Sequence, residues 1–254
     1  MRRTRPSSVP ITLSEEAGIR YLHFGSRWVQ GAMHLGRPTE LVLEYVRQMM
    51  GWMLFLDPPG TILQLGLGAG SLTRFTLAHC PGSRVTAVDC SREVIDTARD
   101  WFALPVDDPR LRVVRSDAQA FVERRDAAGA YGVIQVDLYD MHARGPAIDS
   151  LRFYRACRRA LAQPGICVIN LFGRHDSFAP NLRRIARAFD GRVLALPPIA
   201  AGNRVVFAFS GPSLAVAWEQ LDTRARALQR LHRLSARPWV RALRELSGDA
   251  VCAV

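Results

Sequence analysis

Lysine is absent from this sequence of 254 residues, because all 34 of its basic residues are arginine. The absence excludes reactions that need a lysine amine, such as Schiff-base catalysis, and it excludes nucleotide binding through a P-loop lysine. The formal net charge of +11 would suit a nucleic-acid-binding protein, but the arginines are spread along the chain rather than gathered into one run. We therefore predict that nucleic acid is not the partner.

Long apolar runs and paired cysteine motifs are also missing. No apolar run approaches the ~18 residues of a membrane-spanning helix, and residues 1–10 are basic with no apolar region behind them. The five cysteines show no C-x-x-C spacing, and one is left over after any pairing. This usage is typical of reduced, structural thiols rather than of disulfides or zinc ligands. The sequence thus predicts a cytoplasmic protein without a membrane span, a signal peptide or a bound metal.

What the sequence does contain is an alternation of short apolar runs and helical patterns. The runs of strand length cover residues 61–66, 84–89, 111–115, 131–137, 165–171, 191–196 and 204–209. The helical patterns between them cover residues 71–79, 91–101, 118–125, 150–162 and 178–189. This alternation predicts an α/β fold with a seven-stranded, doubly wound parallel sheet of the Rossmann type and right-handed crossovers.

The segments that flank this sheet predict three regions. We expect residues 1–36 to form an N-terminal arm and hairpin, residues 37–211 the Rossmann-like domain, and residues 212–254 a helical extension. We expect the hairpin around Gly25-Ser26 and an amphipathic helix over residues 39–56. An apolar stripe in the extension should pack on the sheet, and the alternative is a contact with a partner, including a second copy in a homodimer. The stripe consists of Trp218, Leu221, Leu228, Leu231 and Leu234.

A glycine turn, Gly66-Leu-Gly-Ala-Gly70, follows the first strand and opens a helix. Glycines at 66, 68 and 70 let the backbone approach a ligand closely, and the helix start presents free N–H groups. Asp89 ends the next strand, where a carboxylate can accept both hydroxyls of a ribose. A dinucleotide enzyme is the alternative, but Ser71 breaks the G-x-G-x-x-G fingerprint. We therefore favour Gly66, Gly68, Gly70 and Asp89 as a site for a nucleoside without pyrophosphate.

Three further aspartates follow strands at the same predicted edge. Asp117 lies just past the third strand, where it can accept the exocyclic amine of adenine or cap the helix that begins at Ala118. Asp137 ends the fourth strand, and Asp140 follows in the loop, so both can face one cavity. Two close carboxylates repel unless they share a proton or hold a cation, and a cationic amine is the simplest partner. The structural alternative is that one caps a turn while the other pairs with an arginine such as Arg144 or Arg152.

Taken together, these motifs resemble the polyamine aminopropyltransferases, or spermidine synthases, within the class I S-adenosylmethionine-dependent methyltransferase fold. The resemblance covers about residues 62–209 and depends on several short motifs in the right order. They are the glycine turn, Val88-Asp89, Leu104-Pro105, Asp108-Pro109-Arg110-Leu111, Ser116-Asp117-Ala118, Asp137-x-x-Asp140, Gly145-Pro146-Ala147 and Phe153-Tyr154.

The resemblance implies how the donor is bound. The co-substrate would be decarboxylated S-adenosylmethionine, or S-adenosylmethionine itself, with no metal. In the family, the residue that matches Asp89 holds the ribose and the residue that matches Asp117, next to Ala118, holds the adenine. Gln30 is similar to a glutamine that touches the nucleoside from the N-terminal hairpin.

The resemblance also implies the reaction. The residue that matches Asp137 assists the attacking amine, and the match at Asp140 helps to hold that amine. We therefore expect transfer of an aminopropyl group from the decarboxylated donor to a small polyamine acceptor.

Departures from the family pattern leave two alternatives open. Ala69 stands where family members usually carry an aspartate that holds the donor's amine, which relaxes discrimination against the carboxylate of ordinary S-adenosylmethionine. A tyrosine-histidine pair that the family pattern places after the glutamine matched by Gln30 is missing, and Tyr45 is a candidate for its tyrosine. The family's N-terminal β domain is also reduced here to one hairpin. The alternatives are methyl transfer from S-adenosylmethionine to an unknown acceptor, and a nucleoside-binding protein without catalysis.

Overall fold

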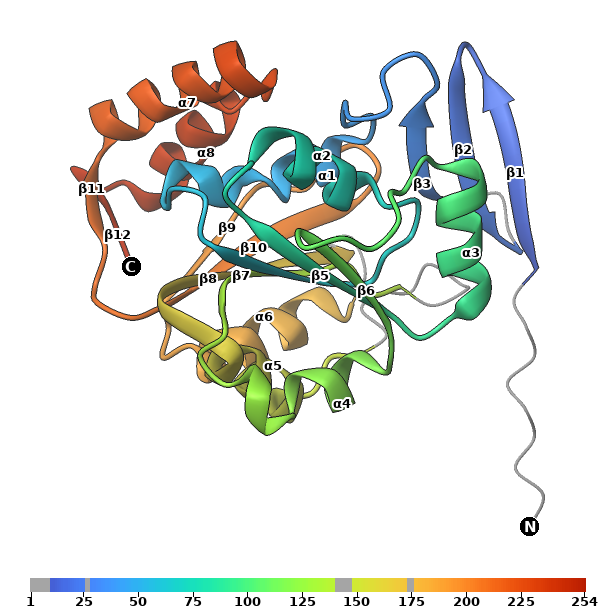
Figure 1. The fold of residues 1–254 in the computed structure, drawn as a ribbon. Coiled ribbons are helices and arrows are strands. Elements are labelled where there is room, and N and C mark those ends of the chain that lie inside the picture. The colour runs from blue at the N-terminus through green and yellow to red at the C-terminus, as the bar shows by residue number, and fades with distance from the viewer. Residues whose placement is uncertain (1–9, 26–27, 140–147, 173–175) are drawn as a thin grey trace.

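A seven-stranded sheet forms the centre of the protein, whose computed structural model describes residues 10–25, 28–139, 148–172 and 176–254. The strand order is β6-β5-β4-β7-β8-β10-β9, and helices cover both faces (Figure 1). The strands are β4 (Thr61–Leu65), β5 (Arg84–Asp89), β6 (Leu111–Arg115), β7 (Tyr131–Val136), β8 (Leu161–Phe172), β9 (Val193–Ala195) and β10 (Asn203–Ser210). The predicted seven-stranded α/β sheet is confirmed.

One strand runs against the others. β4 pairs in parallel with β5 and β7, and β6 and β8 continue the parallel pattern. β10 is antiparallel to both β8 and β9, so the prediction of a wholly parallel sheet was wrong here. Only the loop 196–202 joins β9 to β10, whereas a parallel return needs a crossover of about a dozen residues or more.

Five helices pack on the sheet between its strands. They are α2 (Ser71–His79), α3 (Arg92–Trp101), α4 (Ala118–Val122), α5 (Leu151–Ala160) and α6 (Phe178–Ala188). Ser91 and Ser150 cap α3 and α5, because their hydroxyls accept hydrogen bonds from the Val94 and Phe153 amides at 3.2 and 3.0 Å. α4 is shorter than expected and continues into the 3₁₀ helix η2 (Arg125–Ala127). In Figure 1, α4, α5 and α6 lie on one face of the sheet and α2 on the other.

The N-terminal region forms a three-stranded antiparallel sheet of β1 (Ile11–Glu16), β2 (Ile19–Phe24) and β3 (Val29–His34). The predicted hairpin corresponds to β2 and β3, and Ser26 of its turn lies outside the described residues. β1 was not predicted. Its sequence, ITLSEE, is mostly exposed and shows no apolar run, so only pairing with β2 reveals it as a strand.

The predicted helix over residues 39–56 is instead two short pieces, α1 (Glu44–Gln48) and the 3₁₀ helix η1 (Gly51–Leu54). The break brings the chain against β10, because a Cβ on Gly51 would lie 2.7 Å from the Phe207 ring. Met49, Met50 and Trp52 are fully buried in this layer. Burial against the sheet therefore outweighs the continuity of the helix.

The C-terminal extension also packs on this layer. It contains β11 (Ala215–Ala217), α7 (Trp218–His232), α8 (Arg237–Ser247) and β12 (Val251–Ala253). Trp218, Leu221, Leu228 and Leu234 join the same buried cluster as β10, as predicted, but Leu231 is 60% exposed. Contact with a second copy stays a prediction.

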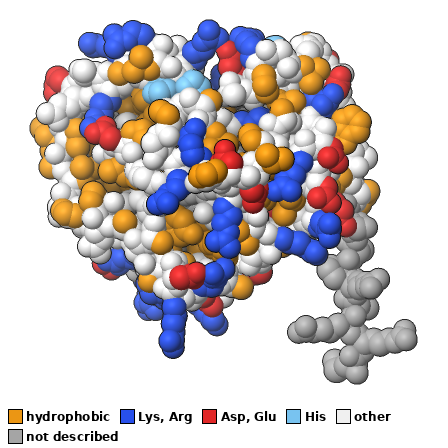
Figure 2. Space-filling model, viewed as in Figure 1, with side chains coloured by type: hydrophobic (Ala, Val, Ile, Leu, Met, Phe, Trp, Pro, Cys, Tyr) orange, Lys and Arg blue, Asp and Glu red, His pale blue; other side chains and the backbone are white. Residues whose placement is uncertain are grey.

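On the face drawn in Figure 2, basic side chains are scattered among acidic and apolar ones. No helix in the described part of the chain is long and apolar enough to cross a membrane.

A histidine pair joins α2 to α7 and predicts a pH dependence of stability. His79 Nδ1 and His232 Nδ1 lie 3.2 Å apart, and a hydrogen bond between them needs at least one neutral ring. Burial lowers the pKa of both histidines, and the neighbouring His232 lowers the pKa of His79 further. The unfolded chain therefore binds more protons, so this stabilisation is present above about pH 6.5 and is lost as pH falls through the lowered folded-state values.

We expect the His232→Gln variant to lose less unfolding free energy than the parent protein between pH 7.5 and pH 5.5. Urea denaturation at both pH values measures this difference. An equal loss in both proteins would show that the pair does not titrate in this way.

Candidate active site

The loops after neighbouring strands are joined by backbone hydrogen bonds at the carboxyl edge of the sheet. The Gly66 amide donates to the Val88 carbonyl at 2.8 Å, and the Asp137 amide donates to the Leu65 carbonyl at 2.9 Å. In the glycine turn, residues 66, 68 and 70 have φ of +90°, +50° and +67°, a region that favours glycine. The glycine turn, the end of β5 and the loop after β7 therefore meet, as the sequence predicts.

Strand β3 passes directly over the glycine turn. Ser71 Oγ donates to the Ala32 carbonyl at 2.9 Å, and a Cβ on Gly31 would lie 2.5 Å from Ala69 Cβ. Gln30 is brought to the same place, since a Cβ on Gly68 would lie 3.3 Å from the Gln30 carbonyl oxygen. The Gln30 Nε2 atom is buried and has no hydrogen-bond partner within the described residues. A donor group is thus available beside the glycine turn.

Asp89 lies at the end of β5 and faces the glycine turn. Its Oδ2 accepts a hydrogen bond from the Leu67 amide at 3.0 Å, and its Oδ1 accepts one from the Ser91 amide at 2.9 Å. Burial raises the pKa of Asp89, although these backbone hydrogen bonds act in the opposite direction. The Asp89 carboxylate therefore holds the glycine turn in place. It lies at the strand end where the sequence predicts a ribose-binding carboxylate.

Asp117 is exposed and caps α4, accepting a hydrogen bond from the Ala120 amide at 2.8 Å. It lines an open hollow of about 460 Å³. The other lining residues are Gln119, Ala120, Glu123, Ile148, Asp149 and Ser150. The capping alternative is therefore confirmed, and contact with adenine stays a prediction. Ala118 has a buried side chain, so only its backbone could face a ligand.

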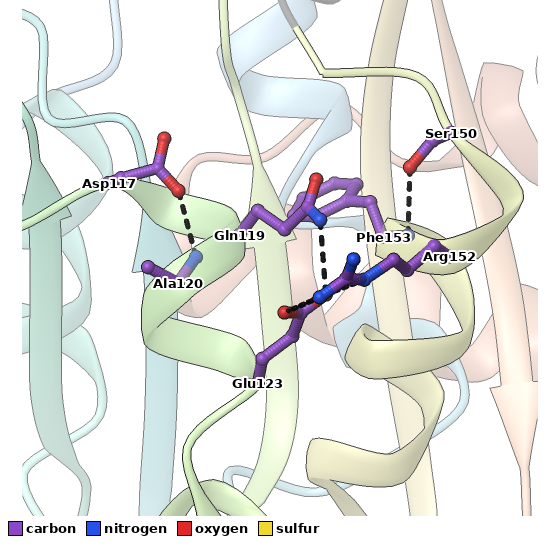
Figure 3. A network of polar contacts seen from close by, with 7 residues as sticks. All are labelled: Asp117, Gln119, Ala120, Glu123, Ser150, Arg152 and Phe153. Atoms are coloured by element: carbon purple, nitrogen blue, oxygen red, sulfur yellow. Dashed lines mark hydrogen bonds and ion pairs between the residues drawn. The ribbon is translucent and has the colours of Figure 1, made fainter.

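Among the described residues, Arg152 pairs with Glu123 and not with Asp137. Its Nε and Nη2 donate to the two Glu123 carboxylate oxygens at 2.7 and 2.6 Å (Figure 3). Asp149 pairs with Arg184 at 2.9 Å. Asp140, Arg144 and residues 145–147 lie outside the described residues.

Asp137 is surrounded by neutral hydrogen-bond donors. Asn170 Nδ2, from β8, donates to Asp137 Oδ1 at 2.9 Å, and the Tyr45 hydroxyl, from α1, also hydrogen-bonds this carboxylate. Burial raises the pKa of Asp137 to about 6, while the bonds from Asn170 and Tyr45 hold it lower than burial alone would. Burial and Asp137 together raise the pKa of Tyr45 well above its ordinary value, so this phenol stays protonated. Asp137 is therefore a carboxylate that can exchange a proton near neutral pH.

Two asparagines of this network were not predicted. Asn170 lies within the buried run of β8, and Asn203 begins β10. Asn203 Nδ2 donates to Asn170 Oδ1 at 3.2 Å and to Tyr139 Oη at 3.3 Å. A polar residue within the apolar run over residues 165–171 was the available signal for Asn170. Within the described ranges, no group of three or more His, Cys, Asp or Glu side chains could hold a metal ion.

This chain is similar in sequence to known proteins. The spermine/spermidine synthase domain matches residues 43–176. A polyamine aminopropyltransferase of Neisseria meningitidis is 38% identical over 239 residues, which cover 92% of this chain and 89% of that protein.

Two solved structures share the fold. A probable spermidine synthase from Corynebacterium glutamicum has a TM-score of 0.72 at 23% identity, covering 94% of this chain and 91% of that chain. Human methyltransferase-like protein 13, in complex with SAH, has a TM-score of 0.64 at 24% identity, and the match covers 76% of this chain and 93% of that chain. Since the family match spans more than half of this sequence and the bacterial relative nearly all of it, the chain belongs to the spermine/spermidine synthase family of transferases.

Proposed function

We propose that this protein transfers an aminopropyl group from decarboxylated S-adenosylmethionine to a polyamine acceptor. The observation that carries the proposal is Asp137, a half-buried carboxylate with a pKa of about 6 beside the glycine turn. A free alkylamine has a pKa near ~10, so almost none of it is nucleophilic at neutral pH. Asp137 accepts the amine proton as nitrogen attacks the methylene carbon next to the sulfonium. The N–C bond forms, the C–S bond breaks, and methylthioadenosine leaves.

The nucleoside of the donor fits the residues around the glycine turn. Gln30 offers a buried amide donor without a partner, and the turn offers a backbone that a ligand can approach closely. Asp89 offers carboxylate oxygens for the ribose, and Asp117 with the Ala118 backbone offers groups for the adenine. We infer that these residues hold the donor while Asp140 helps to hold the amine. Much of the acceleration would then come from positioning, which is worth about 7 to 11 kcal/mol in well-oriented reactions.

A second candidate is methyl transfer from S-adenosylmethionine, and Ala69 is the observation that favours it. Ala69 has no carboxylate to present to the donor. Its side chain is only 3% exposed and packs against Gly31. Without that negative charge, a donor that keeps its own carboxylate is not repelled at this place. Aminopropyl transfer remains the first candidate because a relative that matches 92% of this chain is named polyamine aminopropyltransferase.

Product analysis distinguishes the two candidates. We expect incubation with decarboxylated S-adenosylmethionine and putrescine to yield methylthioadenosine and an aminopropylated amine, detected by mass spectrometry. Parallel incubation with S-adenosylmethionine should yield no S-adenosylhomocysteine above a no-enzyme control. The opposite pattern would establish methyl transfer, and calorimetric binding of both donors without any product would favour a binding protein.

A further inference from the structure

Asn203 lies two strands away from Asp137 in the sheet, yet side-chain hydrogen bonds connect them. Asn203 Nδ2 donates to Asn170 Oδ1 at 3.2 Å, and Asn170 Nδ2 donates to Asp137 Oδ1 at 2.9 Å. The β10–β8 register pairs Asn203 with Phe172, so Asn203 reaches Asn170 diagonally. We propose that Asn203 is a positioning residue that orients the Asn170 amide so that its NH₂ group faces Asp137.

The orientation of the Asn170 amide matters because its two ends differ chemically. An ionised carboxylate only accepts hydrogen bonds, so an amide turned by 180° would place Asn170 Oδ1 against Asp137 Oδ1. Asn170 has no solvent exposure, and bulk water therefore cannot compensate for a lost partner. Asn203 opposes this rotation because its NH₂ group faces Asn170, and of the two ends of the Asn170 amide only Oδ1 can accept that hydrogen bond.

Asn203 also has a hydrogen-bond partner on the loop after β7. Its Nδ2 also donates to Tyr139 Oη at 3.3 Å. Burial and the nearby Asp137 raise the pKa of Tyr139, so the phenol stays protonated through the physiological range. Both acceptors of the Asn203 NH₂ group are thus constant between pH 5 and pH 8. The chain of hydrogen bonds thus runs from Asn203 on β10 through Asn170 on β8 to the Asp137 carboxylate at the end of β7.

The arrangement has a consequence for the proton on Asp137. The bond from Asn170 favours the ionised carboxylate and opposes the effect of burial. The titratable groups that face Asp137 from the surrounding described elements are Tyr45 on α1 and Tyr139 after β7. Both remain neutral near pH 6, so a titration there reports Asp137. Loosening the Asn170 amide should leave more of Asp137 protonated at neutral pH.

The inference rests on the proposed role of Asp137, but its test does not require turnover. The probe is the ¹³C carboxyl resonance of Asp137 in the uncomplexed protein, assigned by its loss in Asp137→Asn. We expect Asn170→Leu to raise the Asp137 pKa by about one unit and Asn203→Leu to raise it by about half a unit. The double variant should match Asn170→Leu alone, because Asn203 acts through Asn170.

Asn181→Leu is the matched control, since Asn181 is a buried asparagine on α6 outside this network. It should change stability without moving the Asp137 titration. Should Asn203→Leu fail to fold, Asn203→Ala removes the same amide without added bulk and carries the same expectation. An unchanged Asp137 pKa in the Asn203 variant, or a shift that persists fully in the Asn170→Leu background, would overturn the proposal. Absence of aminopropyl transfer with the expected pKa shifts would instead refute only the proposed function.

Discussion

Asp137→Asn is expected to lower kcat by about a thousandfold or more while the Kd for the donor stays within about a factor of three. Asparagine has nearly the same shape as aspartate but cannot accept a proton from the attacking amine. The hydrogen bonds that shape the donor site involve the glycine turn and Asp89, and they do not involve the Asp137 carboxylate. Single-turnover kinetics measure the chemical step, and titration calorimetry with the decarboxylated donor measures Kd.

Asp126→Asn is a suitable control for this experiment. Asp126 is an exposed carboxylate that pairs with Arg124 at 2.5 Å, away from the glycine turn. Its replacement should leave both kcat and donor Kd unchanged. If Asp137→Asn loses donor binding as well as turnover, then Asp137 belongs to the donor site and is not the base.

Gly66→Ala is expected to destabilise the protein by about 2 to 5 kcal/mol and to weaken donor binding at least tenfold. Gly66 has a φ of +90°, and a Cβ there would lie 2.1 Å from the Asp137 carbonyl oxygen. The added methyl group therefore imposes both an unfavourable backbone conformation and a collision with the loop that carries Asp137. Urea denaturation measures the first effect, and calorimetry measures the second.

Substitutions at two other glycines separate the cost of the backbone conformation from the cost of the collision. Gly129 has a φ of +64° with no atom within 4 Å of an added Cβ, so Gly129→Ala should show the cost of the backbone conformation alone. Gly60 has open space and no positive φ, so Gly60→Ala should be close to neutral. A Gly66→Ala protein as stable as Gly60→Ala, with unchanged donor affinity, would contradict the close approach of the two loops.

Much of the central sheet could be read from the sequence because its signals are local. The apolar runs that became β5 and β6 matched their bounds, and the pattern over residues 71–79 matched α2. Ser91 capped its helix as its position suggested. Such features depend on neighbours within a few residues, where period and capping chemistry act.

The failures have a common cause in contacts between distant segments. The pattern over residues 39–56 has helical spacing, but close packing of Gly51 on Phe207 divides it into α1 and η1. β1 has few apolar residues and becomes a strand only through its hydrogen bonds with β2. The direction of β10 follows from the short loop before it, which strand patterns do not encode.

The aspartates and the glycine turn were visible in the sequence because each follows a strand, and parallel strands end at one edge of the sheet. The partners that give Asp137 its chemistry were not visible in this way. Tyr45, Asn170 and Asn203 come from three segments widely separated along the chain, and folding alone brings them to one carboxylate. Local pattern thus specifies which elements form and which loops carry acidic groups. The proton affinity of Asp137 depends on burial and on hydrogen bonds across strands, which exist only once the sheet and its covering helices have packed.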